Sequence, residues 1–68
     1  MSQAISLRAM RVNRGISADQ LAEKCGVNRT TITDWERGFR FPNVPKILKL
    51  EAALNCRFDD IRWNVAAN

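Results

Sequence analysis

The sequence predicts an all-α fold, a compact domain of five short helices over residues 1–68. Three observations carry this prediction. Apolar residues recur at spacings of three and four, which is the period of a helix face. Gly15, Gly26 and Gly38 each follow such a segment, where glycine is favoured just past a helix end. No strand pattern of alternating apolar and polar residues rises above noise.

The first helix is expected from residue 3 to residue 14. Leu7, Met10 and Arg11 lie on one stripe of it, so an arginine shares the inward face with core residues. A buried arginine needs a partner, because an unpaired charge inside a protein costs several kcal/mol.

The next two helices are short and closely spaced. Ser17 is an N-cap in a capping-box pattern, S-A-D-Q, and its helix ends near Cys25. Asn28 is a second N-cap and opens a helix over residues 29–37. Two short helices joined by a glycine turn outline a helix-turn-helix, here over about residues 17–37.

Two further helices are expected after a loop. Pro42 disfavours helix at the residue before it, so the preceding segment is extended. Asn43 caps a fourth helix, which reaches Asn55 with a wide apolar face that includes Leu48. A fifth helix is expected over residues 58–64, and residues 65–68 read as a frayed tail.

Composition restricts the classes of function. Eleven Lys and Arg residues face seven Asp and Glu residues, giving a net charge of +4 that favours a polyanionic partner without identifying it. There is no histidine, and hence neither the commonest general base nor the commonest nitrogen ligand for zinc. With no nucleophile motif either, an enzyme is the least supported class, and we expect no cofactor and no metal.

The cysteines and the N-terminal segment point to the interior of a cell. Cys25 and Cys56 show no CxxC spacing and fall in apolar patterns, so we interpret them as small core residues, with a disulfide or a metal site as the alternatives. The first 15 residues contain three arginines and no long apolar stretch, so they form neither a signal peptide nor a membrane span. We expect a cytoplasmic protein.

The order of these features resembles the Cro and phage-repressor type of helix-turn-helix domain. The resemblance lies in LRxxRxxxGxS, then LAxxxGVxxxTIxxWExG, then a proline loop and LxKLxxALN, all within residues 7–55. It implies a five-helix, lambda-repressor-like fold that binds double-stranded DNA. It also implies an ion pair between Arg11 and Glu36 that orients the first helix against the third, the alternative being two solvated charges.

The resemblance makes residues 29–37 the recognition helix, which enters the major groove. Ile32 and Trp35 would anchor its inner face. Threonine suits the outer face, because its hydroxyl can bond phosphate or base and its methyl can pack on thymine. The motif places four outward candidates for base readout: Arg29, Thr30, Thr33 and Asp34.

Arg29 and Asp34 differ in the contacts that they can make with DNA. Arg29 can make a bidentate contact to guanine O6 and N7 and is the best single candidate. Asp34 has three alternatives: it accepts a hydrogen bond from cytosine N4, it rejects other bases, or it orients Arg29 or Arg37.

A second set of residues is expected to touch the sugar-phosphate backbone, with ordinary solvated side chains as the alternative. Arg14 is a further candidate. Phe39 and Phe41 are expected to pack in the core or loop, with stacking on nucleic acid as the alternative. Ala18 stands where many relatives carry a DNA-contacting glutamine, so that contact is absent or is replaced by Ser17 and the helix N-terminus. The phosphate candidates are Ser17, Asn28, Thr31, Arg37, Arg40 and Asn43.

Together these features predict a sequence-specific transcription regulator, a repressor of phage or bacterial type bound as a homodimer to a palindromic operator. No small-molecule ligand and no membrane are expected, and contact with RNA polymerase stays open. The alternatives are a protein-interaction module and an antitoxin-like accessory DNA binder. The dimer contact is expected at apolar residues near the C-terminus: Phe58, Ile61, Trp63 and Val65.

Overall fold

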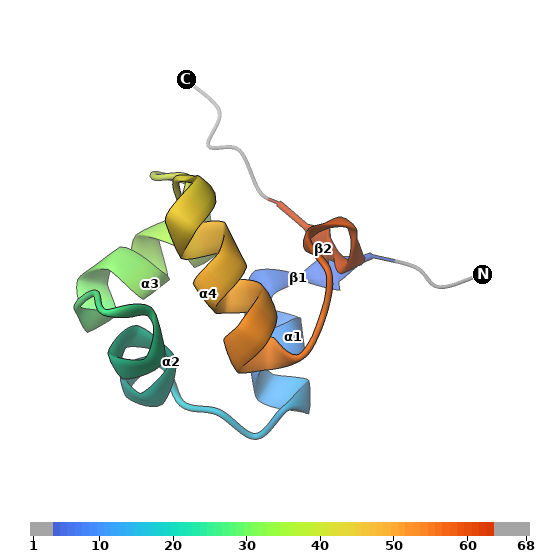
Figure 1. Cartoon of the computed structure of the whole chain (residues 1–68), viewed down its shortest axis with the longest axis horizontal. Coiled ribbons are helices and arrows are strands. Elements are labelled where there is room, and N and C mark those ends of the chain that lie inside the picture. The colour runs from blue at the N-terminus through green and yellow to red at the C-terminus, as the bar shows by residue number, and fades with distance from the viewer. Residues whose placement is uncertain (1–3, 64–68) are drawn as a thin grey trace.

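A computed structural model of the chain describes residues 4–63 (Figure 1). Four α-helices pack around one core, one helix fewer than the sequence predicts, and a pair of short strands lies beside them. The elements are β1 (Ile5–Ser6), α1 (Leu7–Asn13), α2 (Ala18–Cys25), α3 (Arg29–Arg37), α4 (Val44–Leu54), the 3-10 helix η1 (Phe58–Asp60) and β2 (Ile61–Arg62).

Each α-helix begins at a polar cap. Ser17, Asn28 and Asn43 have extended backbones, and their side-chain oxygens accept hydrogen bonds from the helix, as predicted. Ser17 Oγ accepts from the Gln20 N–H at 3.0 Å, and the Gln20 side chain accepts from the Ser17 N–H at 2.8 Å, which completes the capping box.

The first helix is shorter than predicted. Ser6 Oγ accepts from the Ala9 N–H at 3.1 Å, so Ser6 is the cap and α1 begins at Leu7. Ile5 lies before this cap and belongs to strand β1, which the sequence analysis missed. The start that we predicted, at residue 3, lies outside the described residues.

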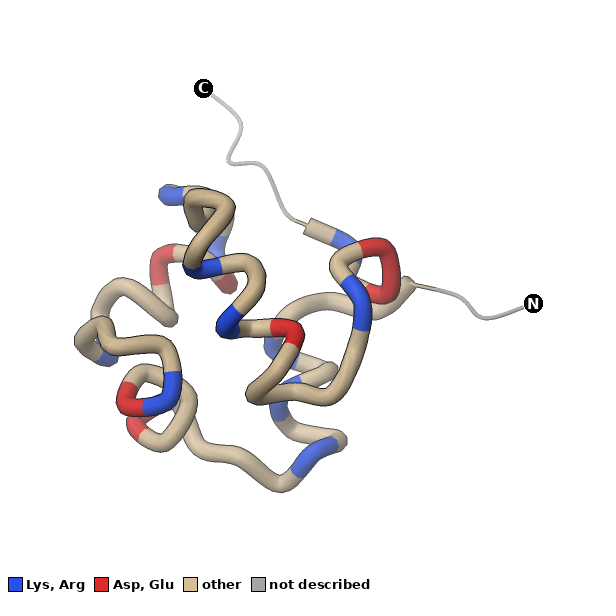
Figure 2. Tube along the Cα trace, viewed as in Figure 1, with Lys and Arg blue, Asp and Glu red and all other residues tan. Residues whose placement is uncertain are grey.

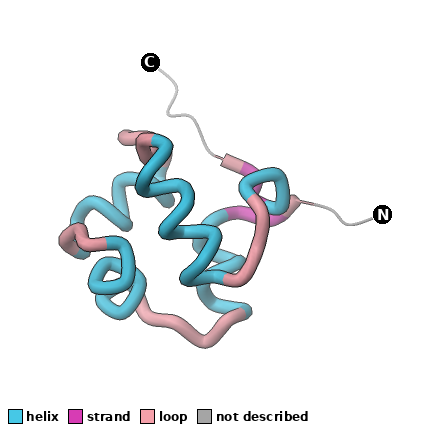
Figure 3. The backbone as a smooth tube through the Cα atoms, viewed as in Figure 1, coloured by secondary structure: helices cyan, strands magenta, loops and turns pink. Residues whose placement is uncertain are grey.

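The predicted fifth helix is wrong. After α4 the chain makes only the single turn η1, held by hydrogen bonds from the Phe58 N–H to Glu51 Oε2 at 2.7 Å and from the Arg57 N–H to Asp60 Oδ2 at 3.0 Å. Ile61 is then extended, and β2 pairs in parallel with β1, Ile5 opposite Ile61. Figure 3 shows the two strands side by side.

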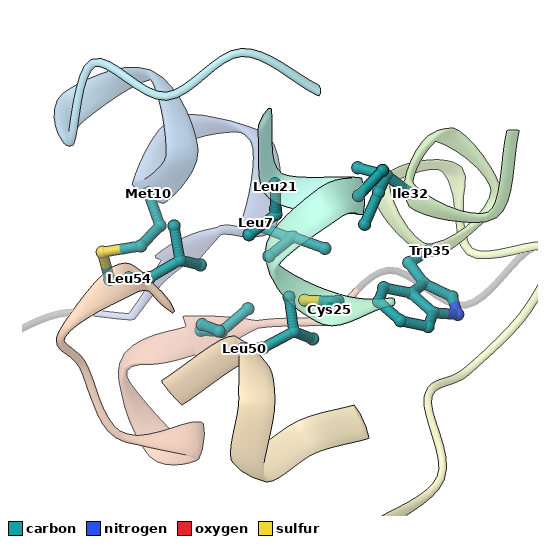
Figure 4. Packing of buried hydrophobic residues seen from close by; sticks show 10 residues of the cluster. Leu7, Met10, Leu21, Cys25, Ile32, Trp35, Leu50 and Leu54 are labelled. Carbon is teal, nitrogen blue, oxygen red and sulfur yellow. The ribbon is translucent and has the colours of Figure 1, made fainter. Parts of the chain in front are cut away.

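The core is formed where the four helices meet. Cys25 is fully buried in it as a free thiol, in agreement with its interpretation as a small core residue. Burial raises the pKa of this thiol, and the charges of Lys46 and Lys49 oppose that shift. Figure 4 shows the packing of Leu7, Met10, Leu21, Cys25, Ile32, Trp35, Leu50 and Leu54.

Helix α4 has a narrower apolar inner face than predicted. Leu50 and Leu54 are fully buried, whereas Leu48 is 59% exposed and Val44 is 68% exposed. Leu48 precedes Leu50 by two residues, which is about half a turn of helix, so the two side chains point to opposite sides. The outer side of α4 therefore carries large apolar residues that no other part of the described chain covers.

Candidate nucleic-acid interface

Helices α2 and α3 meet through a three-residue turn, from Gly26 to Asn28. Gly26 has φ +71°, a left-handed conformation that glycine adopts without strain. The Val27 N–H donates to the Ala22 carbonyl at 3.0 Å, which closes the end of α2. Asn28 then caps α3, so the angle between the two helices is held at both ends of the turn.

Helix α3 has one apolar side and one polar side. Ile32 is fully buried and Trp35 is 4% exposed, and both belong to the central core. Arg29 and Thr30 are exposed on the other side, whereas Thr33 and Asp34 are half-buried. Of the four candidates for base readout, Arg29 and Thr30 are therefore the more exposed.

Arg29 has a carboxylate neighbour that the sequence analysis did not identify. Its Nε lies 4.0 Å from Asp19 Oδ1 of α2, and the two side chains are 69% and 72% exposed. A pair this long and this well solvated contributes little to stability. The Arg29 guanidinium therefore stays available to a ligand.

The three threonine hydroxyls differ in how they are used. Thr31 Oγ1 donates to Asn28 Oδ1 at 3.0 Å, and Thr33 Oγ1 donates to the Arg29 carbonyl at 3.2 Å. Thr30 makes no hydrogen bond through its side chain within residues 4–63. A phosphate oxygen can only accept, so Thr31 and Thr33 would have to rotate their hydroxyls before donating to it.

Asp34 pairs with Arg40, a partner outside the alternatives considered from the sequence. Asp34 Oδ2 lies 3.4 Å from Arg40 Nε, and the Asp34 side chain is 24% exposed. The Phe39 N–H also donates to the Asp34 carbonyl at 2.9 Å. Asp34 thus holds the loop that follows α3 against the helix, and its carboxylate keeps the Arg40 side chain close to α3.

The ion pair implied by the resemblance is present in the structure. Arg11 Nε donates to Glu36 Oε2 at 2.7 Å, and Arg11 Nη1 donates to the Ile16 carbonyl at 3.0 Å. The two charged side chains are only 14% and 11% exposed. The pair therefore joins α1 to α3 and fixes the orientation of α3 relative to the rest of the fold.

Three of the phosphate candidates are helix caps. The side-chain oxygens of Ser17, Asn28 and Asn43 accept backbone N–H groups at 3.0, 2.9 and 3.0 Å. Their remaining polar hydrogens, on the serine hydroxyl and the asparagine amides, can still donate to a phosphate. Ala18, beside the first cap, is half-buried against the core.

Two basic residues serve the fold. Arg14 was a further phosphate candidate, but its Nε donates to the Leu54 carbonyl at 2.7 Å at the end of α4. Lys46 Nζ donates to the Cys25 carbonyl at 3.2 Å at the end of α2. Each satisfies a helix C-terminus, where a positive charge is favourable.

The structure places the residues expected at a dimer contact in different environments. Ile61 is 5% exposed and belongs to the core, so it is not a surface contact. Phe58 and Trp63 stack with ring centroids 5.5 Å apart, and Phe41 meets their edges at 6.1 and 5.0 Å. Val65 lies outside the described residues.

The expectation that Phe39 and Phe41 pack in the core or loop fails for Phe39. Phe39 is 65% exposed and lines a surface groove with Arg8 and Arg37. Arg8 is a residue that the sequence analysis did not single out, because nothing local marks an exposed arginine near the start of a helix. Figure 2 shows Lys and Arg on all four helices, and acidic residues on α2, α3, α4 and η1.

Comparison with known proteins assigns the chain to a family. A family model described as helix-turn-helix matches residues 7–61. The chain belongs to this helix-turn-helix family. The match confirms the family predicted from the sequence, and it covers all four helices; β1 lies before it, and it ends at the first residue of β2.

Two regulators are similar to this family member. One, an uncharacterized HTH-type transcriptional regulator of Archaeoglobus fulgidus, is 33% identical over 55 residues, which are 81% of this chain and 79% of the relative. The other, the HTH-type transcriptional activator BcrR of Enterococcus faecalis, is 29% identical over 55 residues. Those residues span only 27% of the activator, so the likeness concerns one part of that protein.

Both relatives are thus named as regulators of transcription of the helix-turn-helix type. Within residues 4–63, no helix is both long enough and apolar enough to cross a membrane.

Proposed function

We propose that the protein is a sequence-specific regulator of transcription that places α3 in the major groove of double-stranded DNA. The observation that carries the proposal is the exposed end of α3. Arg29 there has only a long, solvated ion pair, and Thr30 has a side-chain hydroxyl without an internal partner in the described chain. An uncommitted arginine near a helix N-terminus suits bidentate contact with guanine, and threonine suits phosphate or thymine.

Phosphate contacts on both sides of α3 would fix its register. Ser17 and Asn28 lie at the starts of α2 and α3, where backbone N–H groups favour anions. Arg37, Arg40 and Asn43 follow along the end of α3 and the loop to α4. Arg40 would exchange its contact with Asp34 for a phosphate, because the Arg40 side chain is 66% exposed.

The proposed regulator acts as a homodimer on a palindromic operator. One copy reads few base pairs, whereas two copies related by symmetry read two half-sites about one DNA turn apart. The contact we propose is an apolar band, defined as Phe41, Val44, Leu48, Phe58 and Trp63. Its first three members are 57%, 68% and 59% exposed, and exposed patches of this kind typically mark interaction sites.

The proposed mode of control is repression. A protein that occupies an operator overlapping a promoter excludes RNA polymerase without a further contact surface. The similar activator from Enterococcus faecalis carries sequence well beyond the matched part, so its mode of control is not transferred. A reporter with the operator placed over or upstream of a promoter distinguishes repression from activation.

The test of the function is selection of randomised duplex DNA by the purified protein, followed by anisotropy titrations of the selected sequence. We expect a palindromic sequence bound about a thousandfold or more tighter than random DNA. Enrichment of no sequence would contradict the proposal and favour a protein-interaction module. Capture of a second protein together with duplex binding would favour an antitoxin-like accessory DNA binder.

A further inference from the structure

We propose that the groove between the start of α1 and the C-terminal half of α3 binds the sugar-phosphate backbone of the DNA. Arg8 and Arg37 each hold a phosphate there, and Phe39 packs on a deoxyribose. The inference rests on the proposed function and extends the interface to α1, beyond the helix-turn-helix itself. The groove is lined by Ser6, Arg8, Thr33, Glu36, Arg37 and Phe39.

The groove continues the outward face of α3. Thr30, Thr33 and Arg37 are spaced by three and four residues, so they follow one stripe along the helix. Thr33 and Arg37 also line the groove. Base readout is proposed at the Thr30 end of this stripe. A DNA strand that follows the stripe toward Arg37 therefore reaches the groove next.

The charge of the groove is positive. Arg8 and Arg37 are exposed, and neither forms an ion pair in the part of the chain that the structure describes. Glu36 is the acidic residue in the lining, and Arg11 compensates its charge at 2.7 Å. Two positive charges from different helices are left to face one channel, and phosphates are the anions that a DNA strand supplies.

The wall formed by Phe39 gives the groove an apolar side. Its ring is 65% exposed, although its backbone is fixed by the hydrogen bond to the Asp34 carbonyl at 2.9 Å. A deoxyribose presents an apolar surface between consecutive phosphates. An exposed ring beside two arginines therefore matches the alternation of phosphate and sugar along a strand.

The width of the groove is fixed before DNA arrives. Arg11 and Glu36 join α1 to α3 directly below it, with their side chains 14% and 11% exposed. Arg8 precedes Arg11 by three residues, and Arg37 follows Glu36. Arg8 and Arg37 are therefore near neighbours of a nearly buried ion pair that fixes the spacing of their backbones, so the backbone loses little entropy on binding.

The test measures how the affinity for the selected duplex depends on salt. Each lost phosphate contact reduces the slope of log affinity against log salt by about 0.9, so Arg8→Ala and Arg37→Ala each lose that much and the double variant about 1.8. Phe39→Ala weakens binding with the slope unchanged. Arg57→Ala is the matched control, because it removes an exposed arginine that lines no part of the groove, and its slope stays near that of the parent protein.

The outcomes separate the two proposals. A reduced slope in the groove variants, with the same sequence still selected, supports the groove. A parent protein that selects a sequence, combined with an Arg8→Ala slope equal to that of Arg57→Ala, overturns the groove and leaves the proposed function standing. A parent protein that binds no duplex overturns both. Thermal unfolding of each variant verifies that the fold is intact.

Discussion

Arg29 is the residue on which base readout depends. Replacing Arg29 with Ala is expected to lower discrimination at one base pair by about 1–3 kcal/mol, because a bidentate contact to guanine is lost. The measurement is a titration against the selected duplex and against duplexes substituted at each position. Affinity for random DNA should fall much less than affinity for the selected sequence.

Asp19→Asn is the variant matched to Arg29→Ala, because it removes the carboxylate 4.0 Å from Arg29. We expect tighter binding to all duplexes and no change in base preference, since a negative charge near phosphate is lost. If Arg29→Ala weakens binding equally on every sequence, Arg29 contacts phosphate and another residue reads the base.

The Arg11–Glu36 pair is expected to show strong coupling. Arg11→Met and Glu36→Leu each remove one member of a nearly buried ion pair, so each should lower the free energy of unfolding by about 3 kcal/mol. The double variant replaces the pair by apolar side chains and should lose far less than the sum. Urea titrations of the four proteins measure the coupling, and additive losses would refute it.

Cys25 makes stability depend on pH in the alkaline range. Burial raises the pKa of its thiol above the ordinary value of 9.0, with Lys46 and Lys49 opposing the shift. The neutral thiol contributes fully to the free energy of unfolding below about pH 9. This contribution is lost as pH rises through the folded pKa, because the unfolded thiol ionises first. Free energies of unfolding between pH 7 and pH 11 should fall less steeply for Cys25→Ala than for the parent.

At the scale of elements, the turn between α2 and α3 depends on Gly26. A Cβ at this position would lie 3.6 Å from the Lys49 side chain, which is ordinary contact, so space is not the constraint. The constraint is φ +71°, and Gly26→Ala should therefore lower the free energy of unfolding by about 1–2 kcal/mol. Gly26→Asn should lose less, because asparagine tolerates this conformation. Equal losses in the two variants, measured by urea titration, would contradict a conformational origin.

Local chemistry explains which elements the sequence could predict. The caps Ser17, Asn28 and Asn43 act on N–H groups three residues away, so a local pattern located α2, α3 and α4 correctly. The strand pair depends on Ile5 meeting Ile61, and nothing in either segment alone reports that pairing. The spacing of Phe58 and Ile61 fits a helix, but Ile61 is extended and pairs with Ile5, so the helix ends after one turn.

The residues of the candidate site divide in the same way, into those that a local pattern predicts and those whose partners depend on the fold. The outward position of Arg29 and Thr30 could be predicted from the sequence, because the helix-turn-helix motif places them there. The partners of the polar groups could not. Asp34 reaches Arg40 because the loop turns back on α3, and Arg8 joins the groove because the chain folds α1 against α3.

At the scale of the whole molecule, the apolar band is expected to hold two copies together. The double change Val44→Thr and Leu48→Gln removes apolar contact area without adding charge near DNA. Self-association should weaken by about tenfold or more, because burying one such side chain is worth about 1.5–3 kcal/mol. Sedimentation equilibrium measures this, and binding to a full palindrome should approach binding to a half-site.

Val12→Thr is the control for the band, because Val12 is 59% exposed on α1 and lies outside it. That variant should associate like the parent protein. If the parent is monomeric at high concentration, both free and on a palindrome, the band is not a dimer contact.

The strand pair has a consequence for how the molecule folds and opens. Ile5 and Ile61 lie near opposite ends of the described chain, so their pairing closes a loop that contains all four helices. Loop closure has an entropic cost that local contacts, such as those of α2 with α3, largely avoid. A pairing of two residues per strand returns few hydrogen bonds for that cost. We therefore expect the pairing to form last during folding and to open first, while the recognition surface on α3 is still assembled.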